Sequence, residues 1–297
     1  AAAEAARRQL LAGAAPRHRE PLRRERWEDA VMTEMSLDDL LNRLEGTDSG
    51  SIAEAVGGIR GRFRSLTAAE QRRAVQGLCG LFYIDLYDRP DLQPAVDAAE
   101  QALVEAGESI VPVVTGLMEG SDLKSHFHLA RVLAGIGAPA LPHLRRLVAT
   151  AEDPYTRSFA LYAIGKFKSE VTNEALAEVV GAMMHPNKEV RDSAARTIGK
   201  ILQVVPAGKL TDRRRQEVFE ALCRLTGDDQ PAIRAKAVRS LGKMAAAGHL
   251  DAARKADLAV RLESLLTRGE DHEWDHAWIV RREAKEALMQ VRKAPAS

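Results

Sequence analysis

Aromatic residues make up only 4% of this 297-residue sequence, and long apolar runs are absent. β-Strands favour aromatic and β-branched side chains, so the scarcity of aromatics argues against a core built from sheets. A membrane-spanning helix needs about 20 consecutive apolar residues, and no segment approaches that length. The first residues, Ala1 to Leu11, also lack the long apolar run of a secretory signal. We therefore expect no membrane partner and a cytoplasmic location.

Cysteine is also scarce, with Cys79 and Cys223 far apart in apolar sequence. A metal or redox pair needs closer clustering, so both are expected to be reduced, buried side chains. Neither sign of charge is in excess: the sequence has 43 Lys and Arg and 42 Asp and Glu, for a net charge of +1. The positions of the charges, rather than their sum, therefore carry the information about a partner.

The sequence does contain a repeated phrase, Arg-x-x-Ala-x-x-x-Ile/Leu, followed three times by Gly-Lys. Its copies begin at Arg157, Arg191 and Arg234, and a weaker copy begins at Arg281. The Ile or Leu of the phrase recurs along the chain at intervals of 30 to 47 residues, at Leu103, Leu133, Ile164, Ile198, Leu241 and Leu288. Periods of this size indicate a stack of similar helical units.

Each unit is predicted to hold a helix A, a short turn and a helix B, giving an all-α superhelix. The A helices are predicted within 110–118, 141–148, 174–184, 215–225 and 258–266. The B helices are predicted within 123–135, 155–167, 189–201, 232–244 and 278–291. The Gly of the phrase is expected to permit either close packing against the next unit or a turn in the chain. Its final Lys has no evident packing role.

The remaining sequence divides the chain further. Residues 1–35 carry many arginines offset by acidic residues, which predicts a flexible or partly helical arm. Residues 36–92 are predicted to form a helical leader, and residues 94–297 the repeats. In the leader, Ser36 is an expected helix cap, and Ser51 with Glu54 and Thr67 with Glu70 are expected capping boxes.

Two Asp-x5-Arg pairs, Asp228 with Arg234 and Asp275 with Arg281, sit at the starts of B segments. Together with prolines in A segments, Pro112 and Pro142, they resemble the HEAT repeat family. The resemblance implies an α-solenoid in which Asp and Arg form a hydrogen-bonded ladder between units and the B helices line the concave side. The sequence departs from the pattern in three units. Ala151 and His185 replace the Asp, and His126 replaces the Arg.

Three groups of residues resemble chemical sites, but none is expected to function as one. His272-Glu-Trp-Asp-His276 matches the zinc-protease motif H-E-x-x-H, but it lacks a third ligand and falls in a predicted turn. Trp274, Asp275 and Trp278 resemble the residues with which HEAT-like alkylpurine DNA glycosylases hold a nucleotide, in composition only. Trp278 is predicted to pack over the terminal unit. His126 and His128 are predicted to lie on a helix surface. We predict no catalytic residue, no metal and no cofactor.

Charge distribution gives the strongest functional signal. Counted with their flanking residues, the five B segments hold 18 Lys and Arg against 5 Asp and Glu, which leaves the rest of the chain acidic; the segments counted are 123–137, 153–168, 187–201, 230–244 and 277–293. Positions two before and two after the recurring Ile or Leu are expected to face away from the core. We predict that these positions form a basic concave groove that contacts a partner: Arg131, Tyr162, Lys166, Arg196, Lys200, Arg239 and Lys243.

The sequence thus predicts a non-catalytic scaffold that binds an acidic protein segment through this groove. A nucleic-acid backbone is the alternative partner, bound by a DNA-binding module or a HEAT-like DNA glycosylase using the same groove. Few aromatics interleave the basic positions, which argues against single-stranded nucleic acid. A HEAT-like lyase is a further alternative, but no residue of the sequence supports it.

Overall fold

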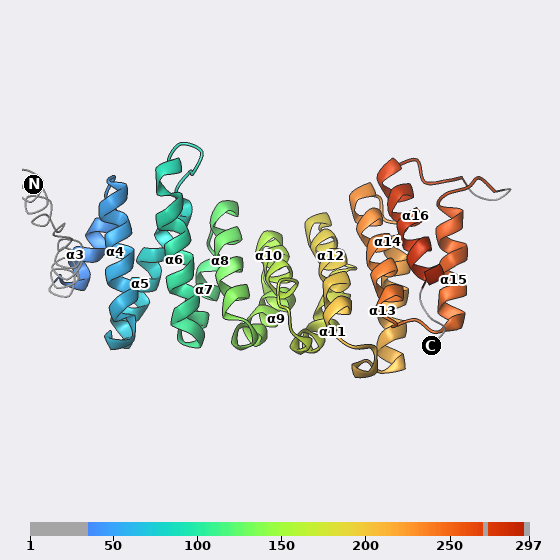
Figure 1. The fold of residues 1–297 in the computed structure, drawn as a ribbon, viewed down its shortest axis with the longest axis horizontal. Coiled ribbons are helices and arrows are strands. Elements are labelled where there is room, and N and C mark those ends of the chain that lie inside the picture. Colours follow the sequence, from blue (N-terminus) through green and yellow to red (C-terminus); the bar gives the residue numbers. More distant parts are fainter. Residues whose placement is uncertain (1–34, 270–272, 294–297) are drawn as a thin grey trace, which may run out of the picture.

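The computed structural model describes residues 35–269 and 273–293, where every regular element is a helix (Figure 1). The predicted all-α fold is confirmed. The A helices are α3 (Leu37–Leu44), α5 (Ala68–Gly80), α7 (Val111–Met118), α9 (Leu141–Thr150), α11 (Leu176–Ala182), α13 (Asp212–Leu225) and α15 (Ala252–Ser264). The B helices are α4 (Ser49–Arg62), α6 (Gln93–Ala106), α8 (Leu123–Ile136), α10 (Pro154–Ile164), α12 (Lys188–Val204), α14 (Pro231–Ala246) and α16 (Trp278–Lys293).

The A and B helices form two layers along one stack (Figure 1). Consecutive B helices pack closely from α4 to α16, whereas consecutive A helices touch each other less. The B helices are therefore the more closely spaced layer of the stack. We call the exposed side of the B helices the B face. Within the described ranges, no helix is long and apolar enough to cross a membrane.

The segment predicted as a leader contributes helices to the same two layers. α4 packs on α6 in the B layer, and α5 packs on both α6 and α7. The separate status of residues 36–92 stays a prediction. The predicted arm at 1–35 lies outside the described residues except for Met35.

Short polar side chains begin most of these helices. Ser36 and Thr67 form capping boxes with the residues three positions later, Asp39 and Glu70, as the spacing predicts for Thr67. The predicted box at Ser51 is wrong. Asp48 caps α4 instead, accepting a hydrogen bond from the Ser51 backbone N–H at 2.7 Å, so the helix begins earlier than expected.

Glycines of the repeated phrase let neighbouring B helices approach closely, as predicted. A Cβ atom added at Gly199 of α12 would lie 2.9 Å from the Cβ of Ser240 on α14. One added at Gly242 of α14 would lie 3.0 Å from the Cα and Cβ of Ala287 on α16. Real Cβ atoms do not tolerate such distances without movement, because protein interiors are close-packed.

Buried hydroxyl groups bind the B helices across this close contact. Thr197 of α12 donates to the carbonyl oxygen of Leu161 on α10 at 2.8 Å. Ser240 of α14 likewise donates to the carbonyl oxygen of Ala195 on α12 at 2.7 Å. Both hydroxyls stand one residue before the recurring Ile or Leu, and each faces the phrase glycine of the preceding unit.

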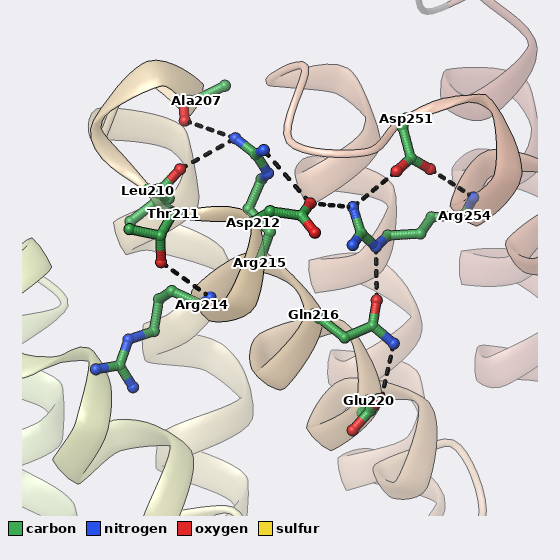
Figure 2. A network of polar contacts seen from close by, with 10 residues as sticks. All are labelled: Ala207, Leu210, Thr211, Asp212, Arg214, Arg215, Gln216, Glu220, Asp251 and Arg254. Atoms are coloured by element: carbon green, nitrogen blue, oxygen red, sulfur yellow. Dashed lines mark hydrogen bonds and ion pairs between the residues drawn. The ribbon is translucent and has the colours of Figure 1, made fainter.

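In the A layer, polar contacts join the neighbouring helices α13 and α15. Figure 2 shows Arg254 of α15 lying between Asp212, at the start of α13, and Asp251, with both carboxylates 2.8 Å from its guanidinium. Its Nε also donates to the Gln216 side chain at 2.6 Å. Hydrogen bonding to Asp212 raises the pKa of Arg254. These charge-assisted contacts tie α13 to α15.

An Arg–Asp ladder connects the last units, but its pairing differs from the simplest expectation. The Arg234 guanidinium donates to the backbone carbonyl of Asp228, six residues earlier, at 2.8 Å. The Asp228 carboxylate instead accepts from Arg191 of the preceding unit at 2.6 and 3.2 Å. Arg234 in turn binds Asp275 of the following unit at 2.6 and 2.9 Å. Each Arg therefore joins its own turn to the next unit.

The ladder is interrupted where the sequence departs from the pattern. His126 is 2% exposed, which corrects the prediction of a surface residue. Its ring nitrogens lie 2.6 Å from the carbonyl oxygen of Asp122 and 3.0 Å from the Thr156 hydroxyl. These two contacts take the place of those that an Arg makes in the other units. Arg157 donates to the Ala151 carbonyl. Among the described residues, no carboxylate lies within 4.0 Å of Arg157, because His185 occupies the Asp position.

Completing the ladder with His185→Asp is expected to raise the free energy of unfolding by about 1 kcal/mol at pH 7, since Arg157 gains a carboxylate partner. Burial, followed by the Arg157 charge, lowers the pKa of His185. Below about pH 6.5 the unfolded wild-type chain therefore binds the extra proton and stability falls. The advantage of the variant should widen between pH 8 and pH 5 in urea denaturation. Equal stability of the two proteins at both pH values would contradict the assignment.

Candidate functional site

The last residue of the repeated phrase places three lysines on consecutive B-layer elements. Lys166 lies two residues after the end of α10, Lys200 lies on α12 and Lys243 on α14. We call Lys166, Lys200 and Lys243 the lysine row. Among the described residues, no carboxylate lies within 4.0 Å of any of the three ammonium groups. The row is therefore a set of charges without ion-pair partners.

The lysines of the row influence one another. Burial lowers the pKa of Lys200, and the positive charges of Lys166, Arg196 and Lys243 lower it further. Burial also lowers the pKa of Lys243, as does Arg239, against a smaller opposing influence of Glu283. A pKa lowered by like charges means that the protonated row has an electrostatic cost. A bound anion would remove that cost.

Tyr162 and Gly165 position the first two lysines. The ammonium groups of Lys166 and Lys200 lie 5.0 and 5.7 Å from the centroid of the Tyr162 ring, within cation–π range. A Cβ atom at Gly165 would lie 3.3 Å from Cδ of Lys200, so the absence of a side chain lets the Lys200 stem cross α10. Lys200 therefore does have a packing contact, which the sequence did not reveal.

The predicted arginines differ from the lysines because each has a carboxylate nearby. Arg131 is 2.9 Å from Glu100 of α6. Arg239 makes two hydrogen bonds to Glu283 of α16, at 2.5 and 2.8 Å, and the hydrogen bonding raises the pKa of Arg239. Arg196 lies 3.8 Å from Asp192. Glu283 is 1% exposed, so its pair with Arg239 also joins α14 to α16.

Sequence reasoning missed several residues on the same face. Phe127 of α8 is 40% exposed and its ring centroid lies 5.7 Å from that of Tyr162. Lys236 of α14 forms an ion pair with Asp192 of α12. Phe127 stands four residues before Arg131, so helical spacing could have predicted that the two residues share a face. The pairing of Lys236 spans 44 residues and has no local signature.

The predicted groove remains a prediction. Pockets in the described surface lie beside Pro112 and Pro142, beside Leu41 and Gly77, and beside Asp153. None of these three includes a member of the lysine row. Lys166 is exposed and the other two lysines are half-buried, so the row lies on an open face.

The structure also places most residues of the zinc-protease motif and of the tryptophan set. His272 lies outside the described residues, and residues 273–277 are not helical. No group of three metal-ligating side chains occurs in the described part of the chain. Asp275 is committed to Arg234. The prediction that Trp278 packs over the terminal unit is wrong: it is 64% exposed, with Arg282 over its ring.

The two cysteines differ in their surroundings. Cys79 is buried, as predicted, and Cys223 is half-buried. Burial raises the pKa of Cys79 to about 12 and that of Cys223 to about 11. Because the thiolate is the reactive form, neither is a reactive nucleophile near neutral pH.

Comparison with known proteins agrees with this architecture. Residues 176–205, which hold α11 and α12, match the HEAT repeat family model. An engineered protein, Northeast Structural Genomics Consortium target OR497, is 18% identical with a TM-score of 0.52, over 90% of this chain and 71% of its own. Target OR329 is 19% identical with a TM-score of 0.50, over 88% of this chain and 99% of its own.

Kap121p bound to Ste12p shares the fold at 10% identity and a TM-score of 0.59. The match covers 87% of this chain and 29% of Kap121p. A search of curated protein sequences gives no match. The chain is therefore an α-solenoid, a class whose stacked units present extended binding surfaces. The match to the HEAT repeat model falls on one of its stacked units, where the repeated phrase predicted a repeat of that kind.

Proposed function

We propose that this protein is a non-catalytic scaffold that binds an acidic segment of a partner protein on its B face. The lysine row carries the proposal, because its three ammonium groups lie on adjacent units and have no carboxylate within 4.0 Å among the described residues. A carboxylate-rich segment would supply the missing partners. Kap121p bound to Ste12p and Kap121p bound to Pho4p give precedents for protein ligands on this fold.

Duplex DNA fits the B face less well. Proteins that neutralise about 6–10 phosphates owe much of their affinity to those contacts. The lysine row offers three free ammonium groups, whereas Arg131 and Arg239 are already bound to Glu100 and Glu283. Asp275, the carboxylate that a glycosylase site at Trp274 would use, is bound to Arg234.

Fluorescence anisotropy with two labelled probes separates the alternatives. A glutamate-rich peptide and a short duplex DNA would each be titrated with the full chain at low and moderate salt. We expect the peptide to bind at both salt concentrations and the DNA to bind weakly. Tight DNA binding with a steep salt dependence, together with no peptide binding, would overturn the proposal in favour of nucleic acid.

A further inference from the structure

An exposed apolar surface adjoins the lysine row. Leu123, Phe127 and Tyr155 are 58%, 40% and 49% exposed, and Phe159 and Tyr162 are partly buried beside them. We call these five residues the aromatic patch. Leu123 and Phe127 are four apart on α8, whereas Tyr155, Phe159 and Tyr162 follow at steps of four and three on α10. Such spacing places each set on one helix face.

Tyr162 joins the aromatic patch to the lysine row. Its ring centroid lies 5.7 Å from Phe127 and 6.3 Å from Phe159. The same ring lies beneath the ammonium groups of Lys166 and Lys200. Each of the two helix stripes is apolar toward its start and basic toward its end, since Arg131 follows Phe127 and Lys166 follows Tyr162 at a spacing of four.

The geometry of the stack also sets a spacing for the ligand. One lysine stands on each of three consecutive B-layer elements, and packed helices lie about 8–10 Å apart. An extended peptide in the polyproline II conformation advances about 3.1 Å per residue with about three residues per turn, so every third side chain lies on one side. One step between neighbouring lysines therefore corresponds to about three residues of such a chain.

We propose that the partner segment is extended, has an acidic residue at about every third position, and carries an aromatic or large aliphatic anchor. The anchor follows the acidic residue that reaches Lys166, because the aromatic patch begins at that end of the row. This inference rests on the proposed function. The patch adds a requirement that charge alone does not impose: a uniformly charged segment would leave exposed aromatic rings without a partner.

Four labelled peptides test the inference against the full chain by fluorescence anisotropy. One has glutamate at every third position with a terminal tryptophan, and a second replaces that tryptophan by serine. The other two keep these compositions with the glutamates contiguous. We expect the spaced, tryptophan-bearing peptide to bind about tenfold more tightly than each of the others.

Variants of the protein show which residues bind the tryptophan of the peptide. Phe127→Ala should weaken the tryptophan-bearing peptide about tenfold more than its serine counterpart. Met184→Ala, at an exposed apolar position just after α11 in the A layer, should change neither affinity. Equal affinities of the two spaced peptides, with binding still dependent on the lysine row, would overturn the anchor while leaving the proposed function intact. Failure of all four peptides to bind would overturn both.

Discussion

Reversing the lysine row, with Lys166→Glu, Lys200→Glu and Lys243→Glu together, is expected to abolish binding of the glutamate-rich peptide. An exposed ion pair contributes about 0.2–1 kcal/mol, and reversal replaces that attraction by a repulsion of similar size. Three reversals therefore sum to about 3 kcal/mol, a loss of at least about 100-fold in affinity. Anisotropy titration at low salt measures it, with thermal melting to show that the variant folds.

A matched control separates the lysine row from the overall charge. Arg146, Arg213 and Arg224 are exposed on the A helices α9 and α13, and changing all three to Glu alters the net charge by the same amount. This variant should keep most of its affinity, because exposed charges more than about 10 Å apart are screened. Equal losses in the two triple variants would show that the general field, rather than the row, holds the peptide.

Arg239 is left out of the reversal for a structural reason. A larger set, Arg196, Lys200, Arg239 and Lys243, would also reverse the predicted basic positions of α12 and α14. In the structure, Glu283 is 1% exposed and bound to Arg239. A glutamate at position 239 would leave a buried carboxylate facing a like charge, which is strongly destabilising. Loss of binding in that set would then report unfolding.

Gly199→Ala and Gly242→Ala are each expected to lower the free energy of unfolding by about 1–3 kcal/mol. The added Cβ would lie 2.9 Å from the Cβ of Ser240 in the first case and 3.0 Å from Ala287 in the second. Both contacts join rigid helix segments, so the B helices must separate. Urea denaturation of the full chain measures the loss.

Gly116→Ala is the control, because a Cβ atom at this exposed position in α7 meets nothing within 4 Å. Alanine has a higher helix propensity than glycine, so this variant should gain about 0.5–1 kcal/mol. Opposite signs for the B-helix and A-helix substitutions are the expected result. If Gly199→Ala also stabilised the protein, the phrase glycine would have no role in packing the units.

Much of the fold follows from the periodicity of the sequence. The recurring Ile or Leu predicted every A and B helix from α7 onward, because each unit repeats the same local pattern of apolar positions. The helix starts were less accurate at α4, where Asp48 competes with Ser51 for the cap. Capping choices of this kind depend on which turn packs better, which local spacing does not encode.

The candidate site was predicted less completely. The sequence treated the positions two before and two after the recurring Ile or Leu alike. In the structure Arg131 and Arg239, two before it, are paired with Glu100 and Glu283, whereas Lys200, two after it, is not paired with a carboxylate among the described residues. Arg239 and Glu283 are 44 residues apart, and no local pattern announces such a contact. The repeated phrase therefore predicted which residues lie on the B face. Only the structure shows which of their charges are paired with carboxylates.

Lysine footprinting tests the central claim most directly. The full chain would be acetylated with and without the glutamate-rich peptide, and the modification at each lysine measured by mass spectrometry. We expect the peptide to protect Lys166, Lys200 and Lys243, and to leave Lys188 and Lys209, which are exposed outside the row, unchanged. Unchanged modification of the lysine row under conditions where the peptide is bound would contradict the account.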